Sequence, residues 1–167
     1  MARSGKDPGR LALVRYLGLA GLLIIADQFT KWLALTSLAF GERVPVIPGF
    51  FDLTLVFNRG AAFSFLAGAD GWQRWLFTGI GVAAALFIVW LLTRHSGQRL
   101  FSLALALILS GAIGNVIDRL RLGQVTDFVL LYWRDWHWPA FNLADAAITC
   151  GAVLLIVDEL LRVRRSR

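Results

Sequence analysis

Long apolar runs separated by shorter polar segments dominate the pattern of this chain. The four longest runs are Leu11–Leu35, Trp72–Leu92, Leu100–Ile117 and Ala140–Leu161. Each is close to the roughly 20 residues that a helix needs to cross the hydrocarbon core of a bilayer. Because lipid offers no partner for unpaired backbone groups, all four runs are predicted to be helices. The pattern therefore predicts an all-α membrane protein with four transmembrane helices.

The segment between the first two runs has a different period. From Phe51 to Asn58, apolar and polar residues largely alternate, which predicts a half-buried β-strand. The turn residues Pro48-Gly49 and Asn58-Arg59-Gly60 bound this strand. We expect a small β-sheet on the membrane surface, with its apolar face in the interface and its polar face lining a groove.

Aromatic residues crowd the segment before the fourth run. They are Tyr132, Trp133, Trp136 and Trp138. Aromatic rings with one polar edge favour the headgroup level of a membrane, so we expect an interfacial aromatic segment in the form of a short helix. A flap that closes over a substrate is the alternative interpretation.

The composition agrees with a membrane protein. The chain has 167 residues, of which 57% are hydrophobic and 17% are charged. No linker or internal repeat divides it, so we expect a single integral membrane domain over residues 1–167. The net charge of +6 predicts contact with anionic lipid and no nucleic acid, because the basic residues gather near the ends of the apolar runs without a nucleic-acid-binding motif.

Basic residues also predict the orientation. Ten of them lie in short segments on one side: Arg3, Lys6, Arg10, Arg15, Arg94, Arg99, Arg162, Arg164, Arg165 and Arg167. Because short basic loops stay in the cytoplasm, both termini are predicted to be cytoplasmic, and segments 36–71 and 118–139 extracytoplasmic. A cleaved signal peptide is the alternative for the first run, but its length and its charged Asp27 and Lys31 argue against cleavage.

The sequence gives no sign of a metal site. Cys150 is the single cysteine, and His95 and His137 are the two histidines, so neither an internal disulfide nor a His/Cys metal site is expected. We interpret Cys150 as a small packing residue, and we expect no cofactor.

Two aspartates beside apolar runs, Asp127 and Asp145, are the strongest chemical signal. An ionisable side chain at membrane depth is costly and is by default a hypothesis of function. Asp145 would lie about 7 Å inside a helix that begins at Ala140. Two adjacent carboxylates cannot both ionise easily, so one stays protonated while the other is a base. This pair predicts general acid–base hydrolysis by water without a covalent intermediate.

Further polar residues lie near the helix ends on the same side. Asp27 and Lys31 are four residues apart, which predicts a structural ion pair on one helix face. Asn142 lies three residues before Asp145 at the start of the fourth helix, where capping would explain one of these residues but not both. Three polar residues close the third helix, where capping or contacts between helices are the simple alternative: Asn115, Asp118 and Arg119.

Five short motifs appear along the chain: Asp27–Lys31, Asn58–Phe63, Gly111–Arg119, Val125–Phe128 and Phe141–Asp145. In the order and spacing of these motifs, residues 20–160 closely resemble bacterial lipoprotein signal peptidase, also called signal peptidase II. Ser110 and Arg59 depart from the family pattern. The resemblance implies an aspartic endopeptidase of the bacterial inner membrane. Such an enzyme cleaves the signal peptide from diacylglyceryl-modified prolipoproteins on the N-terminal side of the lipidated cysteine.

The resemblance also implies residue roles. Asp127 and Asp145 would be the catalytic pair. The implied substrate-binding residues are Asn58, Asn115, Arg119 and Asn142, and the implied structural supports are Asp27, Lys31 and Asp118. We expect a monomer whose partners are prolipoproteins and membrane lipids.

Two other interpretations use the same residues differently. A serine mechanism would use Ser64 or Ser110, but neither has a lysine or histidine at a suggestive spacing. A small proton-coupled carrier would use the aspartates as a relay. The acids gather on one side of the membrane, however, and no inverted repeat supports a carrier.

Overall fold

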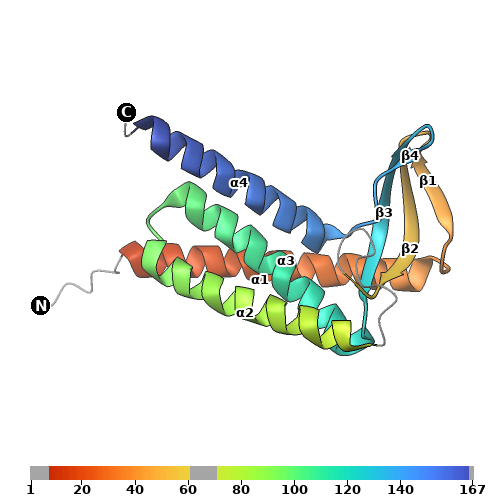
Figure 1. Cartoon of the computed structure of the whole chain (residues 1–167), viewed down its shortest axis with the longest axis horizontal. Coiled ribbons are helices and arrows are strands. Elements are labelled where there is room, and N and C mark those ends of the chain that lie inside the picture. The colour runs from red at the N-terminus through yellow and green to blue at the C-terminus, as the bar shows by residue number, and fades with distance from the viewer. Residues whose placement is uncertain (1–7, 61–70, 166–167) are drawn as a thin grey trace, which may run out of the picture.

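The computed structural model describes residues 8–60 and 71–165. Its helices are α1 (Pro8–Ser37), α2 (Trp72–His95), α3 (Arg99–Leu122) and α4 (Leu143–Arg165). Its strands are β1 (Arg43–Ile47), β2 (Phe51–Asn58), β3 (Val125–Trp133) and β4 (Trp136–His137). The helices run along the long axis and the strands gather at one end (Figure 1). Part of the second motif, Ser64 and the terminal residues Arg3, Lys6 and Arg167 lie outside the described residues.

The four predicted helices are present, but they are not equally apolar. Among the described helices, Gly9–Ser37, Trp72–His95 and Arg99–Leu122 are long and apolar enough to cross a membrane. α4 has a similar length but carries Asp145 in its first turn and arginines in its last. The chain is therefore mostly helical with a small sheet and three candidate spans, and the fourth span stays a prediction.

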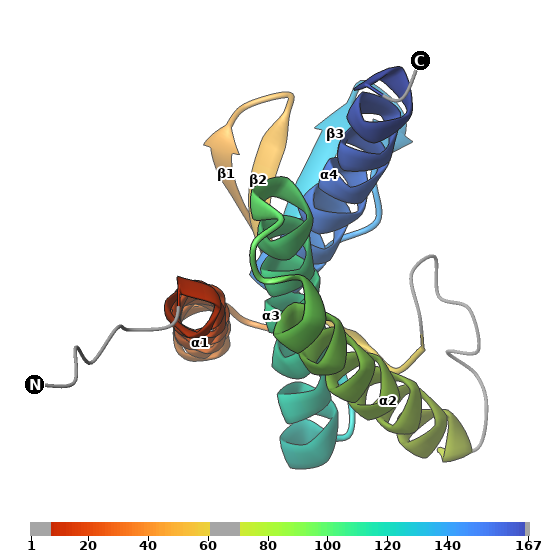
Figure 2. The same ribbon diagram turned by 90° about the vertical axis from the view of Figure 1, so that its left-hand side faces the viewer.

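α3 is the central helix of the bundle. It contacts each of the other three helices, which surround it in the view along the bundle (Figure 2). Small residues on α3 allow this close approach: a Cβ atom added to Gly111 would clash with the backbone carbonyl of Ala144 on α4. One added to Gly114 would come within 2.6 Å of the Asp27 carboxylate on α1. These glycines bring α1 and α4 against the same segment of α3.

The apolar core of the bundle is small. Its members come from α1, α2 and α3: Ala20, Ile88, Leu92, Leu105, Ala106 and Leu109. Many large apolar side chains instead point outward, including Leu22 on α1 and Leu86 on α2, which are more than two-thirds exposed. Apolar surface of this extent is typical of helices that face lipid.

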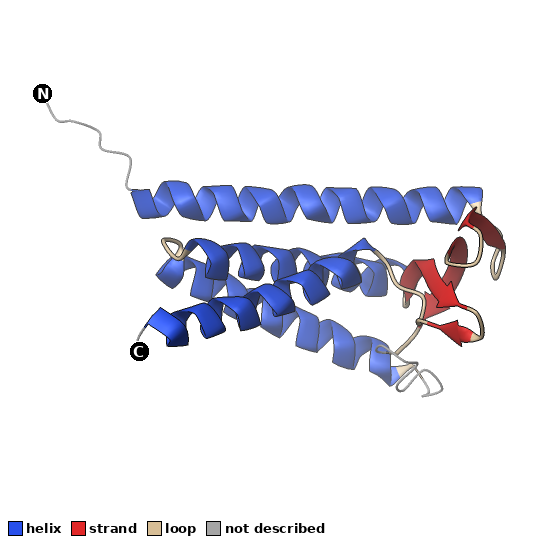
Figure 3. Ribbon diagram, turned by 90° about the horizontal axis from the view of Figure 1, so that it is seen from above, coloured by secondary structure: helices blue, strands red, loops and turns tan. Residues whose placement is uncertain are grey.

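The sheet is antiparallel with strand order β1-β2-β3-β4 and lies beyond one end of the helices (Figure 3). In its register Val56 pairs with Asp127 and Asn58 pairs with Val125, after a register shift between Leu53 and Val56. Directly paired residues share one face of a sheet. The sheet therefore presents Val56, Asn58 and Asp127 on the same side.

The strand predicted over Phe51–Asn58 is confirmed, but its polar side chains do not all face an open groove. Asp52 and Thr54 are buried. The hydroxyl of Tyr132 donates a hydrogen bond of 3.0 Å to the Asp52 carboxylate, which gives this buried acid a partner. A polar residue on a strand can therefore lie inside when a neighbouring strand supplies a donor.

The expectation of a short helix in the aromatic segment is wrong. Tyr132 and Trp133 belong to β3, and after a two-residue turn they pair with His137 and Trp136 of β4. The ring of Tyr132 stacks on His137 at a centroid distance of 5.7 Å. Pairing with the edge of an existing sheet satisfies the backbone groups of this segment better than an isolated helical turn would.

Candidate active site

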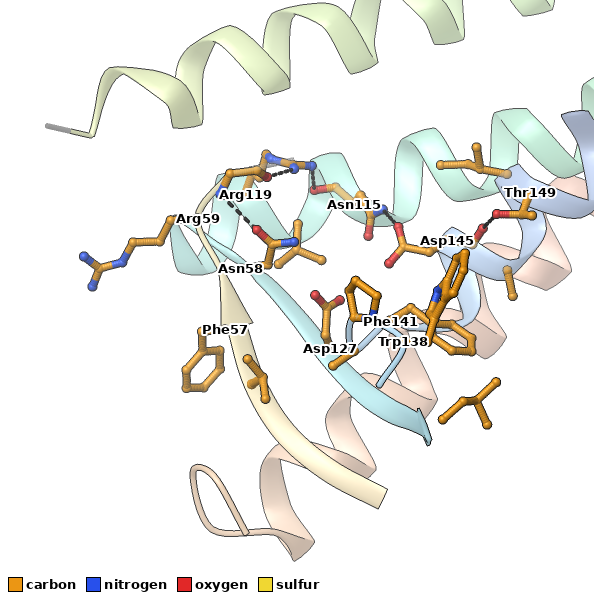
Figure 4. Close-up of a pocket in the computed structure, with 18 of the residues that line it drawn as sticks. Phe57, Asn58, Arg59, Asn115, Arg119, Asp127, Trp138, Phe141, Asp145 and Thr149 are labelled. Atoms are coloured by element: carbon orange, nitrogen blue, oxygen red, sulfur yellow. Dashed lines mark hydrogen bonds between the residues drawn. The ribbon is translucent and has the colours of Figure 1, made fainter. Parts of the chain in front are cut away.

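Asp127 and Asp145 come from different elements and line one cavity of about 750 Å³ (Figure 4). Asp127 lies on β3 and is 2% exposed, whereas Asp145 lies in the first turn of α4 and is partly buried. α4 begins at Leu143, so Asp145 is not five residues inside the helix as the sequence suggested. The structure nevertheless brings the two predicted carboxylates to one site.

Asn142 and Asp145 cap the start of α4 reciprocally. The backbone N–H of Asp145 donates to Oδ1 of Asn142 at 2.9 Å, and the N–H of Asn142 donates to Oδ2 of Asp145 at 3.3 Å. This is the arrangement of a capping box. The expectation that capping explains only one of the two residues is wrong, because each side chain caps the other's backbone and still has a polar atom to spare.

The spare amide nitrogen of Asn142 points to the other aspartate. It donates to Oδ1 of Asp127 at 2.7 Å and lies within 3.3 Å of the backbone carbonyl of Thr126 and Oδ1 of Asn115. Asn142 is completely buried. One asparagine thus connects both carboxylates, since it binds Asp145 through the cap and Asp127 through its amide nitrogen.

Two more asparagines hold the pair. Nδ2 of Asn115 donates to Oδ1 of Asp145 at 2.8 Å. The side chain of Asn58 hydrogen-bonds to Asp127, and its Oδ1 accepts a bond of 3.0 Å from the N–H of Gly60. Hydrogen bonds from amide donors favour the ionised form of a carboxyl group, so each aspartate has donors suited to its charged state.

Arg119 lies in the cavity wall on α3. Its guanidinium donates to the backbone carbonyls of Gly60 at 3.0 Å and Asn115 at 3.3 Å, and it lies 5.3 Å from the ring centre of Phe77. Within residues 8–60 and 71–165 it forms no ion pair with an aspartate. Its positive charge therefore faces the cavity without neutralising either carboxylate directly.

The predicted ion pair between Asp27 and Lys31 is confirmed, with a distance of 2.9 Å between Nζ and Oδ2. Lys31 also contacts Oδ2 of Asp118 at 3.1 Å. All three side chains are buried, and they lie behind the cavity and are not part of its lining. A supporting role for these three residues stays a prediction.

The charge of Asp127 is sensitive to this environment. Burial raises its pKa from the ordinary value near 3.8 to about 7, and the neighbouring charge of Asp145 adds to that rise. Hydrogen bonds from Asn142 and Asn58 and the charge of Lys31 oppose the shift. A carboxyl group that titrates near neutrality can hold a proton beside an ionised partner, which is what acid–base chemistry at neutral pH requires.

The structure adds cavity residues that the sequence did not identify. Most are apolar or aromatic, and they include Phe57, Leu131, Trp138, Phe141 and Ile148. Cys150 also lines the cavity and is exposed, so its interpretation as a packing residue is wrong. Helical spacing offered a signal, because Thr149 lies one turn after Asp145 on the cavity side of α4 and Cys150 follows it.

Ser110 does not join the site. It is buried, its hydroxyl donates to the backbone carbonyl of Leu107 at 2.7 Å, and it does not line the cavity. Neither described histidine lies in the cavity wall with the aspartates. The described residues therefore offer a carboxylate pair and no serine–histidine arrangement.

Comparisons with known proteins point to one family. The family described as Signal peptidase (SPase) II matches residues 19–161. A protein named lipoprotein signal peptidase from Ralstonia nicotianae is 62% identical, and the match covers 98% of this chain and 94% of the relative. One from Cupriavidus necator is 61% identical, and the match covers 98% of this chain and 93% of the relative. A third, from Burkholderia mallei, is 60% identical over the full length of both chains.

Solved structures agree with the sequence relatives. A structure described as a bacterial membrane enzyme at 2.3 Å resolution superposes with a TM-score of 0.83 at 29% identity, covering 92% of each chain. A second, at 1.9 Å resolution, has a TM-score of 0.76 at 31% identity and covers 87% of this chain and 92% of that one. These matches favour a peptidase over a proton-coupled carrier, and the chain belongs to the signal peptidase II family.

Proposed function

We propose that this protein is a membrane aspartic endopeptidase that cleaves diacylglyceryl-modified prolipoproteins on the N-terminal side of the lipidated cysteine. The family assignment supports the activity and the prolipoprotein substrate. The observation that carries the mechanism is the meeting of Asp127 and Asp145 in one cavity, joined through Asn142.

The chemistry follows from one shared proton. The ionised member of the pair takes a proton from a water molecule as the water oxygen attacks the scissile carbonyl carbon, and the protonated member donates to the carbonyl oxygen. In the second step the carbon–nitrogen bond breaks and the leaving nitrogen accepts the proton first taken from water. The other carboxylate recovers its own proton, so both residues return to their starting states.

The supporting side chains divide into two groups. Asn58, Asn115 and Arg119 line the cavity, so we propose that all three contact the substrate peptide, and that Asn58 and Asn115 also hold the aspartates. Asn142 is completely buried, which favours action through the aspartates it binds. Arg119 is suited to bind a peptide carbonyl oxygen, because its guanidinium has more donors than its two backbone partners use.

We further propose that α4 crosses the membrane with the other helices, that both termini are cytoplasmic and that the site lies near the extracytoplasmic surface of the inner membrane. α1 begins and α4 ends at the end of the bundle opposite the sheet, where the arginine-rich last turn of α4 lies (Figure 1). The exposed Trp133 and Trp136 on the sheet suit the headgroup level. We also propose that the protein acts as a monomer in lipid.

The decisive experiment is cleavage of a diacylglyceryl-modified prolipoprotein by purified enzyme in detergent, followed by mass spectrometry. We expect Asp127→Asn and Asp145→Asn each to lose cleavage while retaining a cooperative thermal transition. Asp135→Asn is the matched control, because it makes the same charge change at an exposed turn. Substantial cleavage by either folded catalytic variant would reject the carboxylate mechanism.

A further inference from the structure

A buried cluster of three charged residues, Asp27, Lys31 and Asp118, lies behind the cavity and takes no part in its lining. We call it the Lys31 cluster. An ammonium group has three N–H donors. Lys31 has three acceptors: the carboxylates of Asp27 at 2.9 Å and Asp118 at 3.1 Å, and Oδ1 of Asn115 at 3.0 Å. Each N–H donor of Lys31 therefore has one acceptor, and the position of Nζ fixes the positions of the three acceptor side chains.

Each acid of the Lys31 cluster also holds a backbone amide. Oδ1 of Asp27 accepts a hydrogen bond of 2.8 Å from the N–H of Ala144, and Oδ2 of Asp118 accepts one of 3.0 Å from the N–H of Thr126. Ala144 directly precedes Asp145, and Thr126 directly precedes Asp127. The two carboxylates bound to Lys31 are therefore anchored to the peptides that carry the two catalytic aspartates.

The third contact of Lys31 determines the orientation of an amide group. Because Lys31 can only donate, it requires the oxygen of the Asn115 side chain, and this turns Nδ2 toward Asp145, to which it donates at 2.8 Å. A flipped amide would place its NH2 group against the ammonium and its oxygen against the carboxylate. Lys31 thus also ensures that Asp145 receives a donor.

We infer that Lys31 is a positioning residue for the catalytic pair, setting the separation and orientation of Asp127 and Asp145 through Asp27, Asp118 and Asn115. The inference rests on the proposed carboxylate mechanism. α1 thereby takes part in catalysis without touching the substrate. β3 and α4 are brought together both by Asn142, which binds the two aspartates, and by the Lys31 cluster.

The charge of Lys31 has a second effect. Asp127 faces Asp145 from α4, Lys31 from α1, and Arg119 and Asp118 from α3, while β2 contributes the uncharged Asn58. The Lys31 charge lowers the pKa of Asp127, so its removal raises that pKa. Without Lys31, the negative charges of Asp27 and Asp118 also lose their counter-ion, which acts in the same direction. The pH profile of kcat should then move to higher pH.

A purely structural role would have a different signature. Buried ion pairs are often weak contributors to stability, and the loss of one partner destabilises mainly by leaving a charge unpaired. If the Lys31 cluster served the fold alone, a variant would yield less folded protein, but each folded molecule would keep the normal kcat and pH profile. Kinetics per folded molecule therefore separate positioning from folding.

The test measures kcat, KM and the pH profile of Lys31→Met with the diacylglyceryl-modified prolipoprotein, normalised to folded enzyme. We expect kcat to fall about 100-fold, the effect that a displacement of about 1 Å can have on a catalytic group. KM should change by less than about twofold, because Lys31 does not line the cavity. The limbs of the kcat profile should move up by about half a pH unit or more.

Two further variants make the test robust. Lys31→Met/Asp118→Asn leaves the cluster with the same net charge, since one positive and one negative charge are removed, and the amide oxygen introduced by the second substitution can still accept the Thr126 N–H. This double variant should show the same loss of kcat. Arg162→Met is the control, because it removes a basic residue from an exposed ion pair with Glu159 at the far end of α4.

The outcomes are separable. Normal kcat and pH profile in folded Lys31→Met or in the double variant would overturn the positioning role while leaving the proposed function intact. Failure of both variants to fold would assign Lys31 to the fold and overturn the inference as well. If the wild-type enzyme did not cleave the substrate, the proposed function itself would fail.

Discussion

Asn142 offers the sharpest perturbation of the site, because it performs two functions with different atoms. Its Oδ1 caps α4 by accepting the N–H of Asp145, and its Nδ2 donates to Asp127. Asn142→Ala removes both functions. Asn142→Ser retains an oxygen at the capping position but is too short to replace the bond to Asp127.

Both contacts of Asn142 contribute to stability. Loss of a helix cap costs about 1 kcal/mol. Loss of a buried hydrogen bond to a charged acceptor costs about 2 kcal/mol. We therefore expect Asn142→Ala to lower the free energy of unfolding by about 3 kcal/mol and Asn142→Ser by about 2 kcal/mol. Because the Asn142 bond lowers the pKa of Asp127, both variants should raise that pKa above its value of about 7.

The assay combines thermal unfolding in detergent with the pH profile of prolipoprotein cleavage. Both variants should show a lower kcat, and the ionisation associated with Asp127 should move to higher pH by a similar amount in each. Asn142→Ala should melt at the lower temperature of the two. If Asn142→Ser cleaved at the wild-type rate with an unchanged profile, the bridge between the two aspartates would have no role in catalysis.

Three other perturbations test separate parts of the structure. Because the pKa of Asp127 is raised to about 7 from 3.8, folded protein binds its proton more tightly than unfolded protein does, and stability decreases as the pH rises between these values. In thermal melts at pH 8, Asp127→Asn should therefore be more stable than the wild type, by at most about 4 kcal/mol. At pH 3 it should not be more stable, and an equal gain at both pH values would contradict this linkage. Gly114→Ala should displace the Asp27 carboxylate, lower the free energy of unfolding by about 1–3 kcal/mol and reduce activity. Gly18→Ala is the control, because an added Cβ there meets nothing within 4 Å, and in a thermal melt it should be neutral or stabilising. Alkylation of Cys150, the single cysteine, with a bulky maleimide should block cleavage by filling the cavity, and Cys150→Ser should be resistant. Full activity of the alkylated wild type would show that the thiol lies away from the substrate path.

The site also shows how a membrane protein can maintain a titratable pair. Asp145 occupies the first turn of a helix, where the backbone dipole favours a negative charge. Asp127 lies on a strand, where burial favours the neutral form. Two carboxyl groups in one cavity do not both ionise easily, so in the proposed mechanism the protonated one acts as acid while the ionised one acts as base.

Predictions from the sequence succeeded where the signal was local. The helices appear where apolar runs predicted them, and the strand at Phe51–Asn58 appears where the period changes to two. The prediction failed where a distant segment decided the outcome. Tyr132–Trp138 became a hairpin because β3 pairs with β2, and Asp52 is buried because Tyr132 reaches it.

The amino-acid sequence was enough to predict long apolar helices, to single out the important acids and to show which family the motifs resemble. These are properties of hydropathy, spacing and residue type. The packing of helices and sheet was needed to reveal that Asn142 connects Asp127 to Asp145. It was also needed to reveal that Asp27 and Asp118 hold the amides of Ala144 and Thr126. A backbone amide is the same at every non-proline residue and leaves no mark in the sequence, so its partner is settled only when helices and sheet pack together.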